Sequence, residues 1–345
     1  MTKTKVAING FGRIGRLFFR QAFDNPGIDI IAINDLGDIE NLAYLLKYDT
    51  IYGRYQKQVV ADKMAGAIIV DGKAVKVLQV KEPAQLPWKD MGIDIAVEAT
   101  GFFESYEKAK AHIDAGAKRV VITAPAKDLE GSVDGGGRTV LMGVNDGEMK
   151  TTVLTSNGSC TTNATSPVVQ VMSENPGIAK AILTTVHGYT ATQNLVDGPA
   201  KGSDHRRGRA AAQNIVPSTT GAAISVARAV KELEGKFDGI SIRVPVACGS
   251  IADITFVTKR KVTVEEINDI FKKAASEPRW QGILKVTDDQ LVSSDIIGEP
   301  YGAIVDLKLT KVVDGDLVKV FSWYDNEYGY VSTLVKHVLF AAQAI

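Results

Sequence analysis

The sequence has few cysteines, no excess of one charge and no long apolar run. Two cysteines, Cys160 and Cys248, are too few for a disulfide framework, and no metal-binding spacing such as CxxC or HExxH occurs. Basic and acidic residues number 40 each, so net charge gives no general attraction to nucleic acid or to membranes. No apolar run reaches transmembrane length and no signal-peptide core is present. We therefore expect a cytoplasmic protein with no metal, no membrane association and no nucleic acid as its main partner.

The length and composition favour a globular protein with two domains. The chain has 345 residues, of which 45% are hydrophobic and 23% charged, and one ordinary hydrophobic core does not usually extend over so long a chain. In the first portion, short apolar strand patterns alternate with helical patterns, which predicts an α/β domain with a parallel sheet. The strand patterns cover residues 5–9, 28–33, 93–99 and 119–122, the helical patterns cover 13–23, 39–46 and 105–115, and 67–80 resembles a hairpin.

The second portion has longer β-rich runs and predicts an α+β domain with an open sheet. Two segments predict loops, the polar and basic stretch 197–209 and the glycine-rich stretch 128–138, and the last stretch, 329–345, predicts an amphipathic helix. The β-rich runs are 181–185, 239–244, 251–259 and 303–309, and the helices between them are 220–231 and 264–275.

A glycine-rich turn follows the first predicted strand. Gly10, Gly12 and Gly15 form GxGxxG between a strand and a helix, and Asp35 lies twenty residues beyond Gly15 at the end of the next strand. In this context the motif predicts a dinucleotide site, because glycines let the backbone approach a pyrophosphate and the acidic residue can bind a ribose. The alternative is a strand–helix turn without a ligand.

A lone cysteine stands at the head of a polar run, SNGSCTTN. If residues 161–174 form a helix, Cys160 lies at the helix N-terminus, where the dipole and free N–H groups favour a thiolate. His187 follows a strand pattern and could pair with it, but residue types alone fit a buried cysteine and an unrelated histidine about as well. Cys248 fits a buried thiol better. The other histidines, which we expect to be solvated or structural, are His112, His205 and His337.

Hydroxyl and guanidinium side chains that suit phosphate groups accompany this pair. The alternatives are a solvated loop for the arginines and a helix N-cap for residues 217–221. The side chains concerned are Ser159, Thr161, Thr190, Thr192, Thr220 and Arg243, with Arg206, Arg207 and Arg209 in the basic loop.

Taken together, these motifs resemble phosphorylating glyceraldehyde-3-phosphate dehydrogenases, and the resemblance extends over essentially the whole chain. Glycine at position 158 and Ala164 depart from the family, which usually has alanine and a second cysteine there; neither position carries the chemistry. The matching motifs include NGFGRIGR (9–16), AIND (32–35), EATG (98–101), SNGSCTTN (156–163), TTVHGYTATQ (184–193), RAAAQNIVPSTTGAA (209–223) and WYDNEYGY (323–330).

The resemblance implies a role for each site residue. Cys160 would be the nucleophile and His187 the acid/base that activates it. The attacking inorganic phosphate would be bound by Ser159, Thr161, Thr220 and Gly221, and the substrate phosphate by Thr190, Thr192 and Arg243. NAD would be contacted by Gly10, Phe11, Gly12, Arg13, Ile14, Gly15, Asn34, Asp35, Thr100, Gly101, Thr123, Asn326 and Tyr330. The resemblance leaves open which of Arg206 and Arg207 faces the site.

The implied protein is a cytoplasmic homotetramer with a Rossmann NAD-binding domain, a mostly antiparallel catalytic domain and a returning C-terminal helix. Their expected ranges are 1–159, 160–325 and 326–345. The implied reaction oxidises glyceraldehyde 3-phosphate through a thioester on Cys160, which inorganic phosphate then converts to 1,3-bisphosphoglycerate. Two alternatives stay open: an erythrose-4-phosphate dehydrogenase, which shares these motifs, and an NAD-sensing or nucleic-acid-binding module with a silent site.

Overall fold

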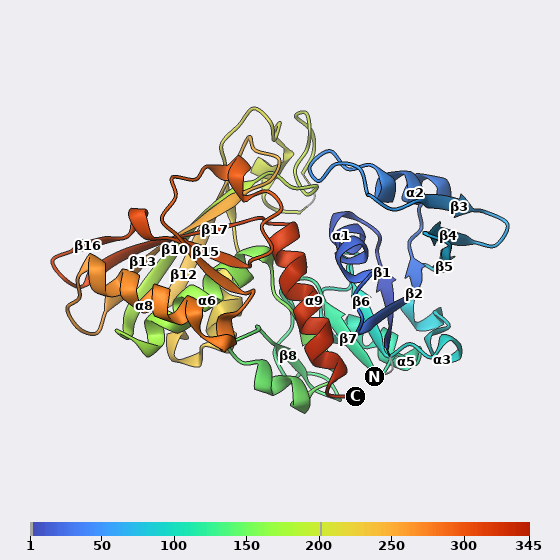
Figure 1. Ribbon diagram of the computed structural model, residues 1–345, viewed down its shortest axis with the longest axis horizontal. Coiled ribbons are helices and arrows are strands. Elements are labelled where there is room, and N and C mark those ends of the chain that lie inside the picture. Colours follow the sequence, from blue (N-terminus) through green and yellow to red (C-terminus); the bar gives the residue numbers. More distant parts are fainter. Residues whose placement is uncertain (1–2, 201) are drawn as a thin grey trace. The chain divides into compact units, whose positions relative to one another are not determined.

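The computed structural model describes residues 3–200 and 202–345, which form two compact units (Figure 1). Unit 1 contains the chain up to Val140, then Asp146–Gly158 and Leu334–Ile345. Unit 2 contains Leu141–Asn145 and Ser159–Thr333. Among the described residues, no helix has the length and apolar character needed to cross a membrane.

Unit 1 is built on a nine-stranded sheet in the order β3-β4-β5-β2-β1-β6-β7-β9-β8. Its pairs are parallel except for the antiparallel β3–β4 and β4–β5 pairs, so the predicted α/β class is confirmed. The central strand β1 is buried along Val6–Asn9, as expected for a parallel strand covered on both faces. The strands are β1 (Thr4–Asn9), β2 (Ile28–Asn34), β3 (Val59–Asp62), β4 (Ala67–Val70), β5 (Lys73–Leu78), β6 (Ile95–Glu98), β7 (Arg119–Ile122), β8 (Gly137–Thr139) and β9 (Leu154–Ser156).

The helices of unit 1 are mostly short. The predicted helical stretch 105–115 is confirmed, but it is divided into α4 and α5, which meet at Lys110. Lys110 lies in a turn between them but keeps right-handed helical dihedral angles. The helical segments are α1 (Arg13–Ala22), α2 (Ile39–Lys47), η1 (Pro83–Gln85), α3 (Trp88–Met91), α4 (Tyr106–Ala109), α5 (Ala111–Asp114) and η2 (Asp146–Thr151).

Unit 2 has an eight-stranded, mostly antiparallel sheet in the order β11-β12-β10-β13-β17-β15-β14, with β16 paired to β17. Only β10–β12 and β14–β15 are parallel. The predicted strand 303–309 ends early at Asp306, whose side chain accepts a hydrogen bond from Lys308 N–H at 3.1 Å and turns the chain. The strands are β10 (Ile178–Gly188), β11 (Val216–Thr219), β12 (Phe237–Val244), β13 (Ser250–Thr258), β14 (Leu284–Thr287), β15 (Ala303–Asp306), β16 (Lys311–Val313) and β17 (Leu317–Tyr324).

Helices cover one face of this second sheet (Figure 1). Helix α6 packs against β13, β15 and β17, α7 packs against β12, and α8 packs against β14. The last helix, α9, is buried on most of its sides, so the amphipathic helix expected at the C-terminus is wrong in its pattern. The helical segments of unit 2 are α6 (Cys160–Glu174), η3 (His205–Gly208), α7 (Ala222–Ala229), η4 (Lys231–Leu233), α8 (Val264–Ser276), η5 (Pro278–Trp280), η6 (Ser293–Ile296) and η7 (Leu307–Leu309). Helix α9 (Tyr328–Ala342) begins in unit 2 and belongs to unit 1 from Leu334 onward.

Candidate functional site

The candidate nucleophile is the first residue of helix α6. A capping box fixes this start: Ser159 Oγ accepts from Thr162 N–H at 3.0 Å, and Thr162 Oγ1 accepts from Ser159 N–H at 3.1 Å. The thiol of Cys160 therefore lies at the end of a 15-residue helix where backbone N–H groups and the helix dipole favour negative charge.

The structure brings Cys160 and His187 together. The distance from Cys160 Sγ to His187 Nε2 is 3.3 Å. The parallel register of β10 and β12 places His187 opposite Arg243, whose Nη1 lies 2.6 Å from His187 Nδ1. The same Nδ1 lies 2.6 Å from Gly188 O. Three side chains from two strands and one helix thus form a continuous chain, Cys160–His187–Arg243.

Burial sets the protonation of this chain. Burial, together with the neighbouring Arg243 cation, lowers the pKa of His187 to about 3. Burial also raises the pKa of the Cys160 thiol, against the opposing effect of Arg243 and of hydrogen bonds at the helix start. These directions favour a thiol beside a neutral imidazole in the ligand-free protein. They do not support the thiolate that the helix N-terminus alone would favour.

The tautomer of His187 decides what it can do to the thiol. A neutral ring carries one N–H group. If Nδ1–H donates to Gly188 O, Nε2 is free to accept the proton of Cys160. If Nδ1 instead accepts from Arg243, the ring proton lies on Nε2 and His187 can only donate to sulfur. Arg243 Nη1 also donates to Gly188 O at 3.1 Å. Arg243 therefore competes with the His187 ring for Gly188 O, and it contacts His187 Nδ1 as well.

Tyr324 borders this pair, and the sequence analysis did not single it out. Its hydroxyl lies 2.9 Å from Thr161 Oγ1 and 2.6 Å from Thr185 Oγ1, and its ring meets the His187 ring edge-on at 5.9 Å. Burial raises the pKa of Tyr324 above its usual value, so the phenol stays protonated. Thr161, expected to bind phosphate, is only 4% exposed and uses its hydroxyl in this contact. Tyr324 belongs to the WYDNEYGY motif (323–330), and this motif is the feature of the sequence that could have identified it.

The other expected phosphate-binding residues of unit 2 lie at the ends of its elements. Thr190 and Thr192 follow β10, and their Oγ1 atoms are 2.9 Å apart. Thr220 Oγ1 accepts from Ala222 N–H at 3.2 Å at the start of α7. Gly221 is the N-cap of α7 and offers no side chain there. Thr220 therefore helps to cap the start of α7, which is the alternative role stated above for residues 217–221.

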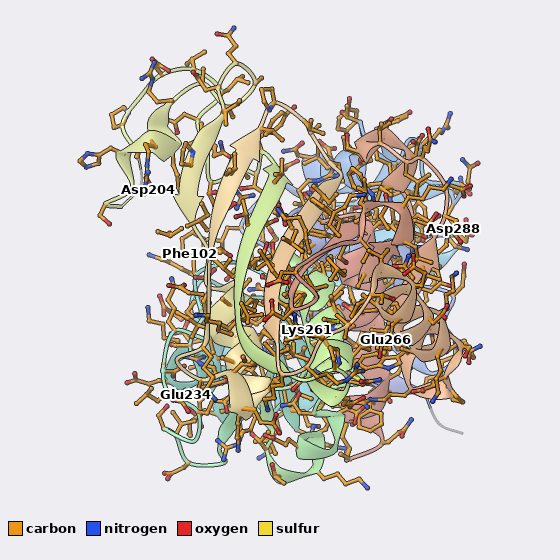
Figure 2. All side chains as sticks on the ribbon, turned by 90° about the vertical axis from the view of Figure 1, so that its left-hand side faces the viewer. Phe102, Asp204, Glu234, Lys261, Glu266 and Asp288 are labelled. Atoms are coloured by element: carbon orange, nitrogen blue, oxygen red, sulfur yellow. The ribbon has the colours of Figure 1, made fainter. Side chains whose placement is uncertain are left out.

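The arginines of the 197–209 loop are paired with acidic residues of the same loop. Arg206 lies 3.0 Å and Arg207 3.5 Å from Asp204, and Arg209 lies 2.9 Å from Asp197. Figure 2 labels Asp204 within this loop. Ion pairs near the surface stabilise a protein little, but these pairs offset the positive charge of the loop.

The glycines of GxGxxG serve different purposes in unit 1. Gly10 has a φ of 94°, and a Cβ there would lie 2.6 Å from Thr100 N. A Cβ at Gly15 would lie 2.1 Å from Gly10 O, so this glycine allows α1 to pack closely on the turn. A Cβ at Gly12 would meet nothing within 4 Å, and Gly12 caps α1 without any side-chain hydrogen bond. The start of α1 thus has open space beside Gly12, and a helix N-terminus of this kind favours a pyrophosphate.

Asp35 stands beside this turn. Its Oδ2 accepts from Phe11 N–H at 2.7 Å and its Oδ1 from Gly37 N–H at 2.8 Å, which joins the two strand ends and leaves lone pairs for a ribose. The side chain of Phe11 is in the core, so only its backbone faces the turn. Arg13 forms an ion pair with Asp49, which engages its guanidinium.

A pocket of about 520 Å³ opens at these strand ends, a size in the range of small-molecule sites. The residues present therefore fit a dinucleotide. Of the other expected contacts, Gly101 is exposed with a φ of 73°, Ile14 is half-buried and Thr123 Oγ1 donates to Glu98 O at 3.0 Å. The lining residues are Asn9, Gly10, Gly12, Asn34, Asp35, Leu36, Val80, Lys81, Glu82, Ala99, Thr100, Phe102 and Phe103.

Two further expected cofactor residues lie in unit 2. Asn326 Oδ1 accepts from Gly249 N–H at 3.1 Å and from Ser250 Oγ at 2.8 Å, so its amide orientation is fixed with the oxygen inward. Tyr330, in α9, is 3% exposed. In the part of the chain that the structure describes, no three acidic, histidine or cysteine residues gather in a way that could hold a metal ion.

Comparisons with known proteins match both portions of the chain. The family described as glyceraldehyde 3-phosphate dehydrogenase, NAD binding domain, matches residues 4–106, and the C-terminal domain of the same enzyme matches 159–326. The chain is 47% identical to glyceraldehyde-3-phosphate dehydrogenase of Clostridium pasteurianum over 345 residues, covering 99% of each chain. It is 46% identical to the Streptomyces coelicolor enzyme over 344 residues (99% of each), and 46% identical to glyceraldehyde-3-phosphate dehydrogenase 2 of Bacillus subtilis over 341 (97% of each). The cofactor is accordingly NAD, and the chain belongs to the glyceraldehyde-3-phosphate dehydrogenase family.

Proposed function

We propose that this protein oxidises D-glyceraldehyde 3-phosphate and phosphorylates the product to 1,3-bisphosphoglycerate, with NAD⁺ and inorganic phosphate. One observation carries the proposal: in a chain of this family, a thiol at a helix N-terminus lies 3.3 Å from an imidazole nitrogen. A nucleophile in contact with a base, which is in turn oriented by a third group, is the arrangement needed for covalent catalysis.

In this proposal His187 moves protons at Nε2. It accepts the Cys160 proton as sulfur attacks the aldehyde carbon, and returns it to the oxygen to give a hemithioacetal. It accepts the hydroxyl proton again as the carbon is oxidised to a thioester. Bound NAD⁺ supplies the hydride acceptor for that step. A phosphate oxygen then attacks the thioester carbon, the carbon–sulfur bond breaks, and Cys160 leaves as a thiolate.

Arg243 connects phosphate binding to the state of the base. Its contact with His187 Nδ1 favours the tautomer that cannot accept the thiol proton. A substrate phosphate offers the guanidinium an anionic partner, with which Arg forms stronger, bidentate bonds. Once Arg243 turns to the phosphate, Nδ1–H can donate to Gly188 O and Nε2 becomes the base.

The remaining residues take the roles that the family implies. Thr190 and Thr192, with adjacent hydroxyls, would bind the substrate phosphate together with Arg243. Ser159, Thr161, Thr220 and Gly221 would form the inorganic phosphate site. We assign residues 1–159 to NAD binding, 160–325 to catalysis and 326–345 to the returning helix. Asn326, whose oxygen is already engaged, would offer its Nδ2 to the carboxamide, with Tyr330 beside it.

We further propose a homotetramer in the cytoplasm. The sheet face of unit 2 opposite its helices exposes Ile182 (57%) and Ile240 (52%), and Ile182 lines a pocket of about 650 Å³ together with Ile224 and Leu317. An apolar patch of this kind suits a subunit contact. The cytoplasm suits Cys160 and Cys248, which are both free thiols. Light scattering of the purified protein tests the tetramer, and Ile182→Asp should lower the mass.

The decisive experiment measures NADH formation from glyceraldehyde 3-phosphate with and without inorganic phosphate. Phosphate-dependent formation of NADH is expected, and faster use of erythrose 4-phosphate would favour the alternative substrate.

Cys160→Ser should abolish the activity and leave NAD binding intact, since serine is a far weaker nucleophile. The matched control is Cys248→Ser: Cys248 is 2% exposed and donates to Asp325, a bond that serine can keep. Loss of activity in the control alone would contradict the proposed nucleophile.

A further inference from the structure

A buried chain of hydrogen bonds lies beneath the NAD pocket of unit 1. Trp88 Nε1–H donates to His112 Nδ1 at 3.0 Å, and His112 Nε2 lies 3.0 Å from Glu98 Oε2. Asn9 Nδ2 donates to the same carboxylate oxygen at 2.6 Å. Thr100 donates to Glu98 Oε1 through its backbone N–H at 2.8 Å and through its hydroxyl. The central pair is almost fully buried, with Glu98 2% and His112 0% exposed.

The indole of Trp88 fixes the direction of both hydrogen bonds that His112 makes in this chain. An indole N–H can only donate, so His112 Nδ1 accepts, the ring proton lies on Nε2, and the imidazole is neutral. His112 therefore donates to Glu98, whose carboxylate receives four donors from three residues. Buried polar groups satisfied in this way hold their partners rigidly.

The chain of hydrogen bonds continues to the end of β2. Asn34 Nδ2 donates to Asn9 Oδ1 at 2.7 Å, and Val80 N–H donates to Asn34 Oδ1 at 2.9 Å. Asn9 and Asn34 are the last residues of β1 and β2 and directly precede Gly10 and Asp35. The chain thus links the ends of the three strands from which the pocket is built.

The backbone has little room to shift where Gly10 packs against Ala99 and Thr100. Gly10 packs so closely on the next turn that a Cβ would lie 2.6 Å from Ala99 C and Thr100 N. Glu98 holds that turn through both bonds to Thr100. A shift of this turn would therefore move Gly10 or change the pocket wall that Asn9, Gly10, Ala99 and Thr100 form.

We propose that Glu98 and His112 are positioning residues for NAD: through Asn9 and Thr100 they fix the turns that bind the dinucleotide, without touching it. The inference rests on the assignment of NAD to this pocket. The motifs of the sequence assign neither residue a role in binding: His112 is expected to be solvated or structural, and Glu98 belongs to EATG without a role of its own.

The test compares two replacements of the same histidine. A glutamine places an amide N–H where Nε2–H lies, so His112→Gln keeps the bond to Glu98. An asparagine reaches only the position of Nδ1, so His112→Asn keeps the bond to Trp88 and leaves Glu98 short of a donor. Titration of the full-length protein with NAD should show a Kd about tenfold higher for His112→Asn, and within about threefold of the wild type for His112→Gln. The kcat at saturating NAD should change little in either.

A second buried histidine of unit 1 supplies the matched control. His337 is 0% exposed, bonds to Thr155 and Asn157, and is not part of the pocket wall. His337→Asn should lower the thermal midpoint as His112→Asn does, with an unchanged Kd for NAD. An equal rise of Kd in both variants, or equal affinities for His112→Gln and His112→Asn, would overturn the proposal.

A further variant covers the case in which His112→Asn does not fold. Glu98→Gln is isosteric but turns one acceptor into a donor that faces Asn9, His112 or Thr100, so it should also raise Kd about tenfold. An unchanged Kd would overturn the proposal. Because these titrations need no turnover, they report on the positioning role even if the protein proves inactive with glyceraldehyde 3-phosphate.

Discussion

At the scale of single residues, the reactive pair combines two opposing influences on one proton. Burial holds the Cys160 proton on sulfur, while the start of α6 and the Arg243 cation favour its release. His187, with a pKa of about 3, is neutral across the physiological range and can act as an acceptor. Reactivity of the thiol is therefore the most direct measure of how these influences balance.

Alkylation of Cys160 by iodoacetamide should become faster as the pH rises, because the raised pKa keeps the thiol protonated at neutral pH. Arg243→Leu should move this rise to higher pH, since it removes a cation that lowers the pKa of the thiol. His187→Asn should slow the reaction at pH 7 by about 100-fold, the lower end of the range typical of a lost acid–base partner. Mass spectrometry can count labels at Cys160 and Cys248 separately. Identical profiles for the wild type and both variants would show that the three side chains are not coupled.

The preference for NAD over NADP is also decided by single residues. The Asp35 carboxylate borders the pocket, and its neighbour Leu36 is 61% exposed and offers no cation for a 2′-phosphate. We expect a higher kcat/KM for NAD, and Asp35→Gly should narrow the preference. The same variant should weaken binding of both cofactors, because Phe11 N–H and Gly37 N–H lose their acceptor. Equal use of the two cofactors by the wild type would contradict this expectation.

At the scale of elements, the start of α6 carries both a structural and a chemical demand. Ser159→Ala removes half of the capping box and should lower the free energy of unfolding by about 1 kcal/mol. Thr263→Ala removes the N-cap of α8, where Thr263 accepts from Glu266 N–H, and should cost a similar amount. Urea titrations measure both losses.

Enzyme kinetics distinguish the effect of losing the Ser159 cap from the effect of losing the Thr263 cap. Only Ser159→Ala should raise the KM for inorganic phosphate, since only that hydroxyl is proposed to bind it. If the α8 variant impaired phosphate use equally, the effect would be one of general stability.

At the scale of the whole molecule, two buried histidines make stability depend on pH. The pKa values of His187 and His337 are each lowered to about 3, chiefly by burial, whereas an unfolded histidine titrates near its ordinary value of about 6.5. Below that value the unfolded chain binds protons that the folded chain does not. The contribution of these two histidines to the free energy of unfolding is therefore fully present above about pH 6.5. It decreases as the pH falls towards 3, by up to about 1.4 kcal/mol per pH unit for each histidine.

His337→Asn should remove one of the two contributions. The slope of unfolding free energy against pH, measured by urea titration between about pH 6 and 4, should decrease by up to about 1.4 kcal/mol per pH unit. A slope equal to that of the wild type would mean that His337 is protonated in the folded protein.

Local patterns in the sequence determined much of the fold. The apolar strands, the GxGxxG turn and the start of α6 near Cys160 follow from spacing and from residue types that act within a few positions. The class of each domain followed from the alternation of these patterns. The resemblance of the motifs, and not their spacing, supplied the roles assigned to Cys160, His187 and Arg243.

Tertiary structure alone decided which of these residues touch. Cys160 and His187 are 27 positions apart and His187 and Arg243 are 56 apart, and only the parallel register of β10 and β12 makes them a chain. The same holds for Glu98 and Asn9, which are 89 positions apart yet share a buried hydrogen bond. Burial, and with it the pKa of His187 and the tautomer of His112, depends on neighbours contributed by the whole unit. A sequence pattern describes one element at a time, whereas hydrogen bonds and desolvation depend on where the elements meet.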